Sequence, residues 1–450
     1  MTQCSREPLS MTRLDYKNVV ADFSGGRITS DAGALLMREA DRDLGLIDAL
    51  DEAIEDTRDQ RYTTHEQRAL LAQRIFGIDL GYEDLNDHDQ IRKDPSLKVA
   101  AERRPEGEDL SSASTLCRLE NRVDRRSLWR MSEVLVDAFI GRHSVPPRRI
   151  VLDVDATDDV VHGGQQKRFF HGFYRSYCFL PLYVFCGKAL LAAYLRPANS
   201  GPSRHARAIV KMLVAKLRSA WPDTQIIVRG DSGFCRWRTM AWCENHGVDY
   251  IFGIAKNDVL KRKASDWLQQ AREGYEKTGN KQTVFGEFEY AAGSWSRERR
   301  VIAKAEHLAG KSNPRFVVTS LGGRPERLYR KQYCGRGEME NRIKEQQLGL
   351  FADRTSCTDF LANQFRLLLA SAAYVLIEHM REKFLAGTEL ADAQVSTIRL
   401  RLLKIGALVG ESVRRVTFRM ASGYPLKELF SHVLRRMRAG PRGKPLLAAA

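Results

Sequence analysis

Three acidic residues lie at positions from which a folded chain could bring them together to bind metal ions. Asp155 closes an apolar run that begins at Arg149, and Asp231 closes a second apolar run that begins at Gln225. Glu340 lies far downstream, in a segment whose spacing is helical. Two strand-end aspartates and a helical glutamate supply the hard oxygen ligands that a pair of divalent cations needs for phosphodiester chemistry. We therefore expect these three carboxylates to form a metal-dependent phosphodiester site.

The first apolar run offers a second carboxylate. Asp153 and Asp155 are two residues apart, so in a strand both side chains project from the same face. Asp155 is the preferred metal ligand, with Asp153 as its substitute. Acidic residues often begin the loops that follow strands, so no single carboxylate indicates a site by itself. The three carboxylates taken together, in this order, favour the site.

The segment around Glu340 predicts a face that could bind phosphate. Tyr333, Arg336 and Glu340 are separated by three and four residues, and Lys344 follows Glu340 by four. Residues at these spacings share one face of a helix. The glutamate could hold metal, the arginine and lysine could bind phosphate, and the tyrosine could donate a hydrogen bond to it. The alternative is a solvated helix with one stabilising Glu–Lys pair.

An alternation of strands and helices must position these residues. Apolar runs predict strands, and the segments between them show helical spacing; the predicted strands are 149–155, 177–186, 189–196, 225–230 and 249–254, and the predicted helices 204–219 and 235–246. This pattern predicts an α/β fold in which helices cover a mixed sheet. Open sheets place ligands at the carboxyl ends of their strands, where Asp155 and Asp231 fall.

The pattern divides the chain into five regions. We expect a helical DNA-binding or dimerisation region at 1–145, the first part of a catalytic domain at 146–256 and a β-rich insertion at 257–328. A helix within 329–380 would carry Glu340 and complete the catalytic domain, and 381–450 would form a basic helical region. The insertion contains three further strand-like runs, at 284–290, 300–306 and 315–321.

The charge of the chain favours a polyanionic partner. The formal net charge is +16, and residues 401–450 hold eleven Lys/Arg against two Glu. Such a surplus indicates nucleic acid first, although a merely basic enzyme is the alternative. A short turn before residue 115 leads into a possible recognition helix, from which Arg118 and Arg122 could reach DNA. A helical packing hairpin would explain the same pattern.

The remaining composition indicates a protein of the cytoplasm. The eight cysteines are scattered and form no CxxC pair, which favours reduced thiols. The longest apolar stretch, 365–377, is interrupted by Arg366 and is too short to cross a bilayer. We therefore expect no membrane association.

At these motifs the chain resembles DDE transposases of bacterial insertion sequences. More narrowly, it resembles the branch with a Tyr-x2-Arg-x3-Glu-x6-Lys (YREK) signature, and within that branch insertion-sequence family 1380. The resemblance spans nearly the whole chain. Its main motifs are Leu152-Asp-Val-Asp-Ala-Thr157, Arg229-Gly-Asp-Ser-Gly-Phe234, the Tyr333/Arg336/Glu340 set and Asn363-Gln-Phe-Arg366.

The resemblance implies a ribonuclease-H-like catalytic domain and a role for each matching residue. Asp155, Asp231 and Glu340 would hold two Mg²⁺ ions, for which Mn²⁺ can substitute. Tyr333 and Arg336 would be accessory phosphate-binding residues. The signature lysine falls at Gln347, a departure that leaves Lys344, one helical turn earlier, as the nearest candidate.

The resemblance also implies partners. The protein would bind the terminal inverted repeats of an insertion sequence, cleave the DNA at the element ends and join the 3′-hydroxyls to target DNA. Its partner is double-stranded DNA, its synaptic complex holds a homodimer, and it acts in the bacterial cytoplasm near the nucleoid. In related enzymes an insertion contacts the transposon end, where an aromatic residue can stack on a flipped base. Trp295 is the candidate, although packing at the rim of a small sheet is the ordinary alternative.

Two other functions compete. Asp153-Val-Asp155-Ala-Thr157 fits the DxDxT loop of haloacid-dehalogenase-type phosphatases, with Asp153 as nucleophile and Asp155 as acid/base. The region around Asp231 lacks the second acid that such a phosphatase needs. A catalytically inactive DNA-binding relative is the third possibility, and the retention of all three carboxylates argues against it.

Overall fold

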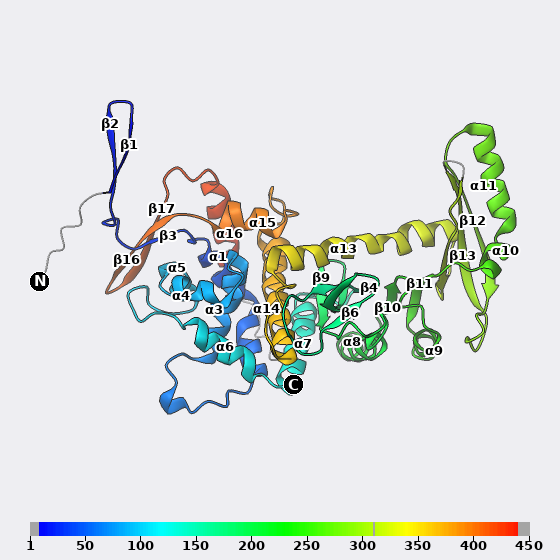
Figure 1. Ribbon diagram of the computed structural model, residues 1–450, viewed down its shortest axis with the longest axis horizontal. Helices are drawn as coiled ribbons and strands as arrows, with labels where there is room; N and C mark the ends of the chain where they lie inside the picture. Colours follow the sequence, from blue (N-terminus) through cyan, green and yellow to red (C-terminus); the bar gives the residue numbers. More distant parts are fainter. Residues whose placement is uncertain (1–8, 309–310, 440–450) are drawn as a thin grey trace, which may run out of the picture. The chain divides into compact units, whose positions relative to one another are not determined.

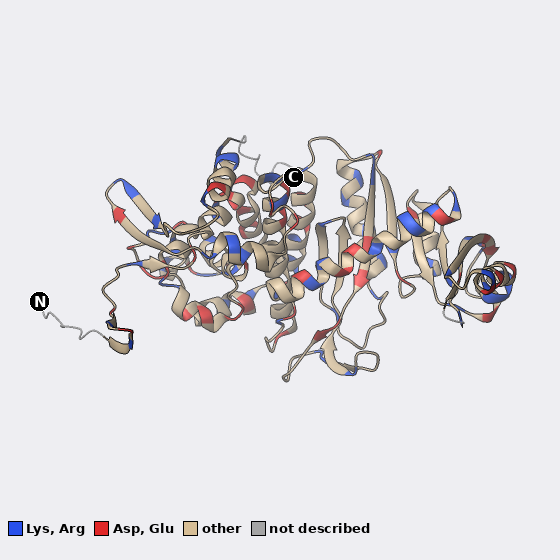
Figure 2. Cartoon of the chain, turned by 90° about the horizontal axis from the view of Figure 1, so that it is seen from above, with Lys and Arg blue, Asp and Glu red and all other residues tan. Residues whose placement is uncertain are grey.

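The computed structural model describes residues 9–308 and 311–439, which form two compact units (Figure 1). Among the described residues, the first unit comprises 9–47, Asp56–Leu119 and 379–439. The second comprises Asp48–Glu55 and Glu120–Glu378. Acidic and basic residues are interspersed along the ribbon (Figure 2).

The second unit is built on a nine-stranded mixed sheet. Its central strands are β4 (Arg149–Ala156), β8 (Leu182–Cys186), β9 (Ala189–Tyr194), β10 (Gln225–Gly230) and β11 (Asp249–Ile254). They lie in the order β9-β8-β4-β10-β11. β4, β10 and β11 are parallel, whereas β8 is antiparallel to β4 and to β9. This order and direction are those of a ribonuclease-H-like sheet, so the predicted fold class is confirmed.

Burial on both faces explains the apolar runs of the parallel strands. On one face Leu152 of β4, Val228 of β10 and Phe252 of β11 are at most 1% exposed, and on the other face so are Ile227 and Ile251. Helices α7 (Arg125–Gly141), α8 (Ala206–Ala220) and α9 (Trp237–Asn245) contribute apolar side chains to the same core. Parallel strands covered in this way read as nearly continuous hydrophobic runs.

The insertion after β11 contains helices as well as strands. It begins with α10 (Asp258–Lys263) and α11 (Ser265–Thr278), neither of which was expected. β12 (Gln282–Tyr290), β13 (Arg299–Leu308), β14 (Lys311–Ser312) and β15 (Arg315–Thr319) follow. β15 pairs with β11, and β13 and β12 extend the sheet beyond it, while α11 lies along β12 and β13 (Figure 1). The insertion is therefore hydrogen-bonded to the central sheet.

A long helical stretch follows β15 and is irregular. It begins with α12 (Pro325–Arg327) and ends after α13 (Gly337–Lys344). Between them lie a π-helical segment, η3 (Leu328–Tyr333), and a 3₁₀ turn, η4 (Cys334–Arg336). A second π-helical segment, η5 (Glu345–Gly349), closes the stretch. Such departures from α-helical geometry are frequent at functional sites.

Helix α14 (Phe360–His379) supports the edge strand β9. The side-chain carbonyl of Gln364 accepts a hydrogen bond from Leu195 N at 2.6 Å, and its amide donates to Ala193 O at 3.1 Å. The helical segment Phe360–Phe384 is long and apolar enough to cross a membrane by length and composition. It is 94% buried over its most apolar window, which is typical of a core helix.

The first unit contains strands in regions that were expected to be mostly helical. β1 (Leu9–Leu14) and β2 (Lys17–Ala21) form a hairpin, and β3 (Ile28–Thr29), β16 (Ala407–Ser412) and β17 (Arg415–Met420) form a three-stranded sheet. β1 and β17 have no buried residue, although apolar and polar residues alternate along β17. The described parts of 1–145 and 381–450 therefore contain helices, as expected, together with these strands.

The other elements are short or helical. They are α1 (Ala34–Leu44), α2 (Leu46–Ala53), η1 (Gln60–Tyr62), α3 (Gln67–Leu80), η2 (Leu85–Asp87), α4 (His88–Ile91), α5 (Pro95–Ala100), α6 (Ala113–Arg122), β5 (Asp159–Val160), β6 (Phe169–His171), β7 (Ser176–Phe179), η6 (Met380–Phe384), α15 (Val395–Ile398), η7 (Arg399–Leu403) and α16 (Lys427–Ala439).

Candidate active site

The register of two parallel strands brings the predicted aspartates to one edge of the sheet. Val154 of β4 lies opposite Gly230 of β10, so Asp155 and Asp231 are the next residue on neighbouring strands. Asp231 Oδ1 accepts a hydrogen bond from Gly233 N at 2.8 Å, which shapes the turn after β10. Both carboxylates therefore lie at the carboxyl ends of adjacent strands.

Arg336 links the strand edge to the helix that carries Glu340. Its Nη1 donates to Asp155 Oδ2 at 2.7 Å, and its Nη2 donates to Glu340 Oε1 at 3.1 Å. The Asp155 side chain is 14% exposed, whereas that of Glu340 is 52% exposed. One guanidinium thus bridges two of the three predicted metal ligands.

The pKa of Asp155 reflects its burial and its charged neighbours. Burial is the largest cause that raises the pKa of this carboxyl, Arg336 opposes it, and the charges of Asp231 and Glu340 act with burial, so that the resulting pKa is about 6. Asp231 and Glu340 therefore both lie close enough to repel the Asp155 carboxylate. A cation placed among them relieves that repulsion.

Asp153 has a different partner. Arg229 lies opposite it in the register of β4 and β10. Arg229 Nε and Nη2 donate to the two oxygens of Asp153, with Nη2–Oδ2 at 2.7 Å, and Nη1 donates to the carbonyl of Gln332. Asp153 is 3% exposed. This buried ion pair joins β4 and β10 to the segment that carries Tyr333.

Tyr333 packs against a glycine of β11. A Cβ at Gly253 would lie 2.6 Å from the Tyr333 hydroxyl, so the missing side chain permits this approach. Burial raises the pKa of Tyr333, and the nearby Arg336 opposes that shift. Tyr333 is therefore held as a neutral phenol, which can donate a hydrogen bond, beside the carboxylate cluster.

The donor chemistry of the cluster fits a hard divalent cation. Asp155, Asp231 and Glu340 offer carboxylate oxygens, which Mg²⁺ prefers. Across residues 9–308 and 311–439, no group of three His, Cys, Asp or Glu side chains is arranged to hold a metal ion. Arg336 instead supplies the positive charge between Asp155 and Glu340.

The comparison with protein families decides the assignment. The family model described as transposase DDE domain group 1 matches residues 11–441. The chain belongs to this DDE transposase family. A comparison with curated proteins gives no match. Among solved structures, the chain is similar to a piggyBac transposase synaptic complex with hairpin DNA, at 10% identity and a TM-score of 0.42, over 92% of this chain and 83% of that one.

In this DDE transposase the two candidates for the signature lysine differ in their contacts. Lys344 is exposed on α13 and forms no ion pair within the part of the chain that the structure describes. Gln347, where the signature lysine would fall, donates from Nε2 to Asp158 O at 2.8 Å. The amide of Gln347 therefore reaches the loop that follows β4.

Trp295 lies with the sheet of the insertion. Its ring meets the Tyr290 ring edge-on at 5.5 Å, and the Arg299 guanidinium lies 5.4 Å from its centroid. It is partly buried against the core of the second unit. These contacts suit packing at the rim of the sheet, and the base-stacking role stays a prediction.

Helix α6 begins at Ala113, so most of the turn expected before residue 115 is helical, and two residues separate α6 from α7. Arg118 of α6 is exposed and donates to Thr115 Oγ1 at 2.9 Å, and Arg122 ends that helix. Asp124 then caps α7 by accepting from Ser127 N at 2.8 Å. The DNA-contacting role of Arg118 and Arg122 stays a prediction.

Tyr174 is a further residue near the carboxylates. Burial raises the pKa of Tyr174, and the charges of Asp158, Asp155 and Asp231 raise it further. Tyr174 therefore lies within electrostatic reach of the site. The only signal in the sequence is the run of aromatic and basic residues at 167–175.

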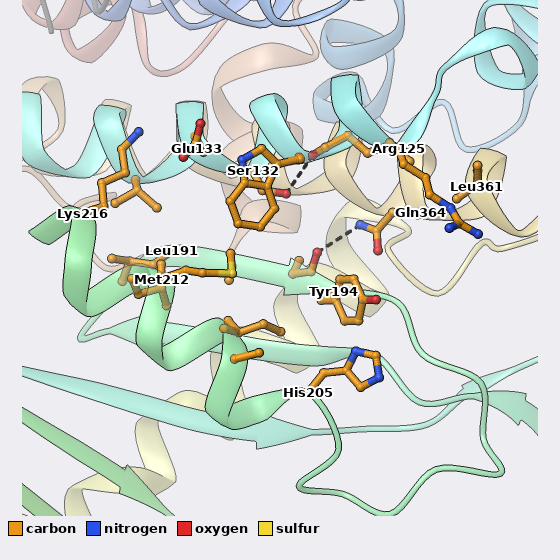
Figure 3. Close-up of a pocket in the computed structure, with 18 of the residues that line it drawn as sticks. Arg125, Ser132, Glu133, Leu191, Tyr194, His205, Met212, Lys216, Leu361 and Gln364 are labelled. Carbon is orange, nitrogen blue, oxygen red and sulfur yellow. Dashed lines mark hydrogen bonds between the residues drawn. The ribbon is translucent and has the colours of Figure 1, made fainter. Parts of the chain in front are cut away.

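The second unit also contains an apolar pocket of about 460 Å³ beside the edge strand (Figure 3). Leu191, Tyr194 and Met212 line it, and Arg125 and Lys216 are among its polar residues. Tyr194 stacks on His205 with ring centroids 5.5 Å apart. The pocket lacks the carboxylates of the candidate active site.

Proposed function

We propose that this DDE transposase cleaves DNA at the ends of an insertion sequence and joins the 3′-hydroxyls to target DNA. The observation that carries the proposal is the pair of hydrogen bonds from Arg336 to Asp155 and Glu340, at 2.7 and 3.1 Å. These bonds unite the helix with the strand edge where Asp231 lies. Family membership supplies the reaction class.

Two Mg²⁺ ions, or Mn²⁺ in their place, would be held by Asp155, Asp231 and Glu340. When bound, they would activate the attacking water or hydroxyl and stabilise the leaving oxygen. The raised pKa of Asp155, caused by burial and by the two neighbouring carboxylates, supports this donor set. Asp153 is not available as a substitute ligand while both its oxygens accept from Arg229.

The other residues of the site would bind and orient the phosphate. The Arg336 guanidinium presents N–H groups in a planar fork that matches two phosphate oxygens. The Tyr333 phenol would donate a further hydrogen bond. The Asp153–Arg229 pair would hold β4, β10 and the backbone of Gln332 in register, and so position Tyr333.

The finer assignment is also a proposal. We place the chain in the YREK branch near insertion-sequence family 1380, with Gln347 in place of the signature lysine. Its partners would be the double-stranded terminal repeats and target DNA. Because two ends must be joined to one target, a homodimer would form the synaptic complex.

The phosphatase alternative is disfavoured by one contact. A phosphorylated nucleophile must reach its substrate, but Asp153 is 3% exposed and both its oxygens are engaged by Arg229. The cleavage assay described next distinguishes an active transposase from an inactive DNA-binding relative.

The test is cleavage of a labelled duplex that carries the element's terminal repeat, with Mg²⁺ or Mn²⁺. Wild type should nick at the repeat boundary, and Asp231→Asn and Glu340→Gln should give no detectable product while still binding the duplex. Glu338→Gln is the matched control, since Glu338 is 75% exposed on the same helix. Cleavage by Asp231→Asn at the wild-type rate would refute the proposal. Tight binding without cleavage by wild type would favour an inactive relative.

A further inference from the structure

A groove in the second unit concentrates unpaired positive charge. Arg207, Lys211, Arg236 and Arg238 line it together with Ser203 and Thr239, and no carboxylate contributes to its wall. We call it the basic groove. Its four cationic side chains belong to exposed residues. Within residues 9–308 and 311–439, none of the four forms an ion pair.

Other arginines of the same unit are neutralised. Arg299 donates to both oxygens of Glu244, and Arg300 donates to Glu287. In the basic groove the arginines contact neutral groups instead: Arg236 donates to Ser203 Oγ at 3.0 Å, and Arg238 lies 5.3 Å from the Trp237 ring. The charge of the groove is therefore available to an external anion.

The position of these charges is unfavourable without an anion. Arg207 lies in the first turn of α8 and Arg238 in the first turn of α9, and neither turn contains an acidic residue. The N-terminus of a helix carries a partial positive charge that disfavours cations. Its free backbone N–H groups bind phosphate well. Two helix starts and four cations thus form one anion-binding surface.

The basic groove adjoins the catalytic edge. The turn after β10 runs from Asp231 to Arg236, and within it Gly233 packs so closely on Pro202 that a Cβ would lie 3.0 Å from the proline ring. Arg236 then bonds Ser203 in the loop before α8. His205, which begins α8, has a φ of 66°, a strained value for a non-glycine residue. Short, tightly packed connections therefore join the groove to Asp231.

The chemistry of the groove suits contacts that do not depend on sequence. Cations, hydroxyl groups and helix N-termini bind phosphate oxygens, which position DNA but carry no sequence information. Asn and Gln, which read adenine, and Asp and Glu, which read cytosine, are absent from its lining, and its arginines and lysine are also phosphate ligands. Terminal repeats must be recognised by sequence, whereas varied target DNA need not be. We propose that the basic groove binds the phosphate backbone of target DNA, an inference that rests on the proposed transposase function.

The test compares two double variants. Arg207→Ala/Arg238→Ala removes two groove charges, and Arg148→Ala/Arg149→Ala removes two exposed charges at the opposite, amino end of β4. The first readout is binding of a labelled random-sequence duplex at several salt concentrations. The groove variant should lower the slope of log affinity against log salt by about 1.8, since each phosphate contact contributes about 0.9. The control should keep the wild-type slope.

The second readout is strand transfer from pre-cleaved ends at varied target concentration. The groove variant should need more target DNA for half-maximal transfer, yet bind a repeat duplex that stops at the element boundary as the control does. An unchanged salt slope would overturn the proposal, and so would an equal loss of repeat binding, which would assign the groove to the element end. Duplex binding needs no catalytic step. If the wild-type protein binds DNA but shows no strand transfer, the proposed function is refuted. The salt dependence of duplex binding then still decides whether the basic groove contacts DNA.

Discussion

Two aspartates on one strand have different environments because different arginines reach them. Asp153 lies opposite Arg229 in the strand register and is enclosed by it, whereas Asp155 emerges at the strand end and meets Arg336. Strand periodicity alone could not choose between them, since both project from the same face. The signal that was missed is Arg229 itself, because an arginine in an apolar central strand needs a buried acid beside it.

This difference predicts that Asp→Asn substitutions at the two positions have different effects, one on stability and the other on cleavage. Asp153→Asn leaves the Arg229 guanidinium buried without its charge partner, which should cost about 3–5 kcal/mol of unfolding free energy. Asp155→Asn removes a carboxylate that Asp231 and Glu340 repel, so stability should hold while cleavage is lost. Urea unfolding monitored by fluorescence, together with the nicking assay, measures both effects. Equal destabilisation by the two variants would contradict this assignment.

At the scale of elements, buried strands could be predicted from the sequence, whereas elements with few buried side chains could not. The strands 149–155, 225–230 and 249–254 were predicted to within one residue, because each is an apolar run covered on both faces. Helix α11 was missed, because its fourteen residues contain only one fully buried side chain, Ala271. Where few side chains meet a core, local sequence carries little periodic signal.

The candidate site shows the same division. The strand ends and the spacing of Arg336 and Glu340 could be predicted from the sequence. The i,i+4 hydrogen bond between Arg336 and Glu340 is present in the structure. The π-helical and 3₁₀ segments between Leu328 and Arg336 could not be predicted from the sequence, because they depend on packing against β11 rather than on local propensity. Gly253 is the element-scale feature that permits this packing.

Substitution of that glycine should move the helix residue that touches it. Gly253→Ala places a methyl group 2.6 Å from the Tyr333 hydroxyl and 3.1 Å from Ser232 N. Overpacking of this kind should cost about 1–3 kcal/mol and reduce cleavage. Adding Tyr333→Phe removes the nearer clash, so stability should partly recover while cleavage does not. Thermal unfolding and nicking rates test this, with Gly410→Ala as control because its Cβ would meet nothing within 4 Å. A fully stable, active Gly253→Ala would contradict the packing.

At the scale of the whole molecule, two compact units are assembled from segments far apart in the chain. The pairing of N-terminal and C-terminal segments in the first unit was not predictable from local patterns, because it depends on contacts across more than 300 residues. One example is the ion pair of Lys383 with Asp43, at 2.5 Å. The charge pattern of the sequence indicated a polyanionic partner but not the location of the basic groove.

Buried titratable groups of the first unit should set how stability depends on pH. Burial lowers the pKa of His88 to about 2, and Arg74 donates to its Nε2 at 3.1 Å. Below about pH 6.5 His88 binds a proton in the unfolded chain but stays neutral in the folded protein. Unfolding free energy should therefore fall as pH drops from 6.5 towards 2, by up to about 1.4 kcal/mol per unit.

Asp79 acts with the opposite sign. Burial raises its pKa well above the usual range, so the folded state keeps a proton that the unfolded chain releases near pH 3.8. Its contribution to stability is lost as pH rises through the folded pKa. Urea midpoints across pH should show a shallower acid limb in His88→Gln and a gain at neutral pH in Asp79→Asn. An unaltered acid limb in His88→Gln would show that His88 is not the responsible group.

The hydrogen bonds that join Gln364 to Ala193 and Leu195 have a consequence for self-association of the sheet. An apolar edge strand with unpaired backbone groups is a template for edge-to-edge aggregation. The Gln364 amide supplies one donor and one acceptor to β9, as a neighbouring strand would, but offers no further edge for growth. This side chain thus occupies two backbone groups at the end of β9 that a strand from a second copy would otherwise pair with.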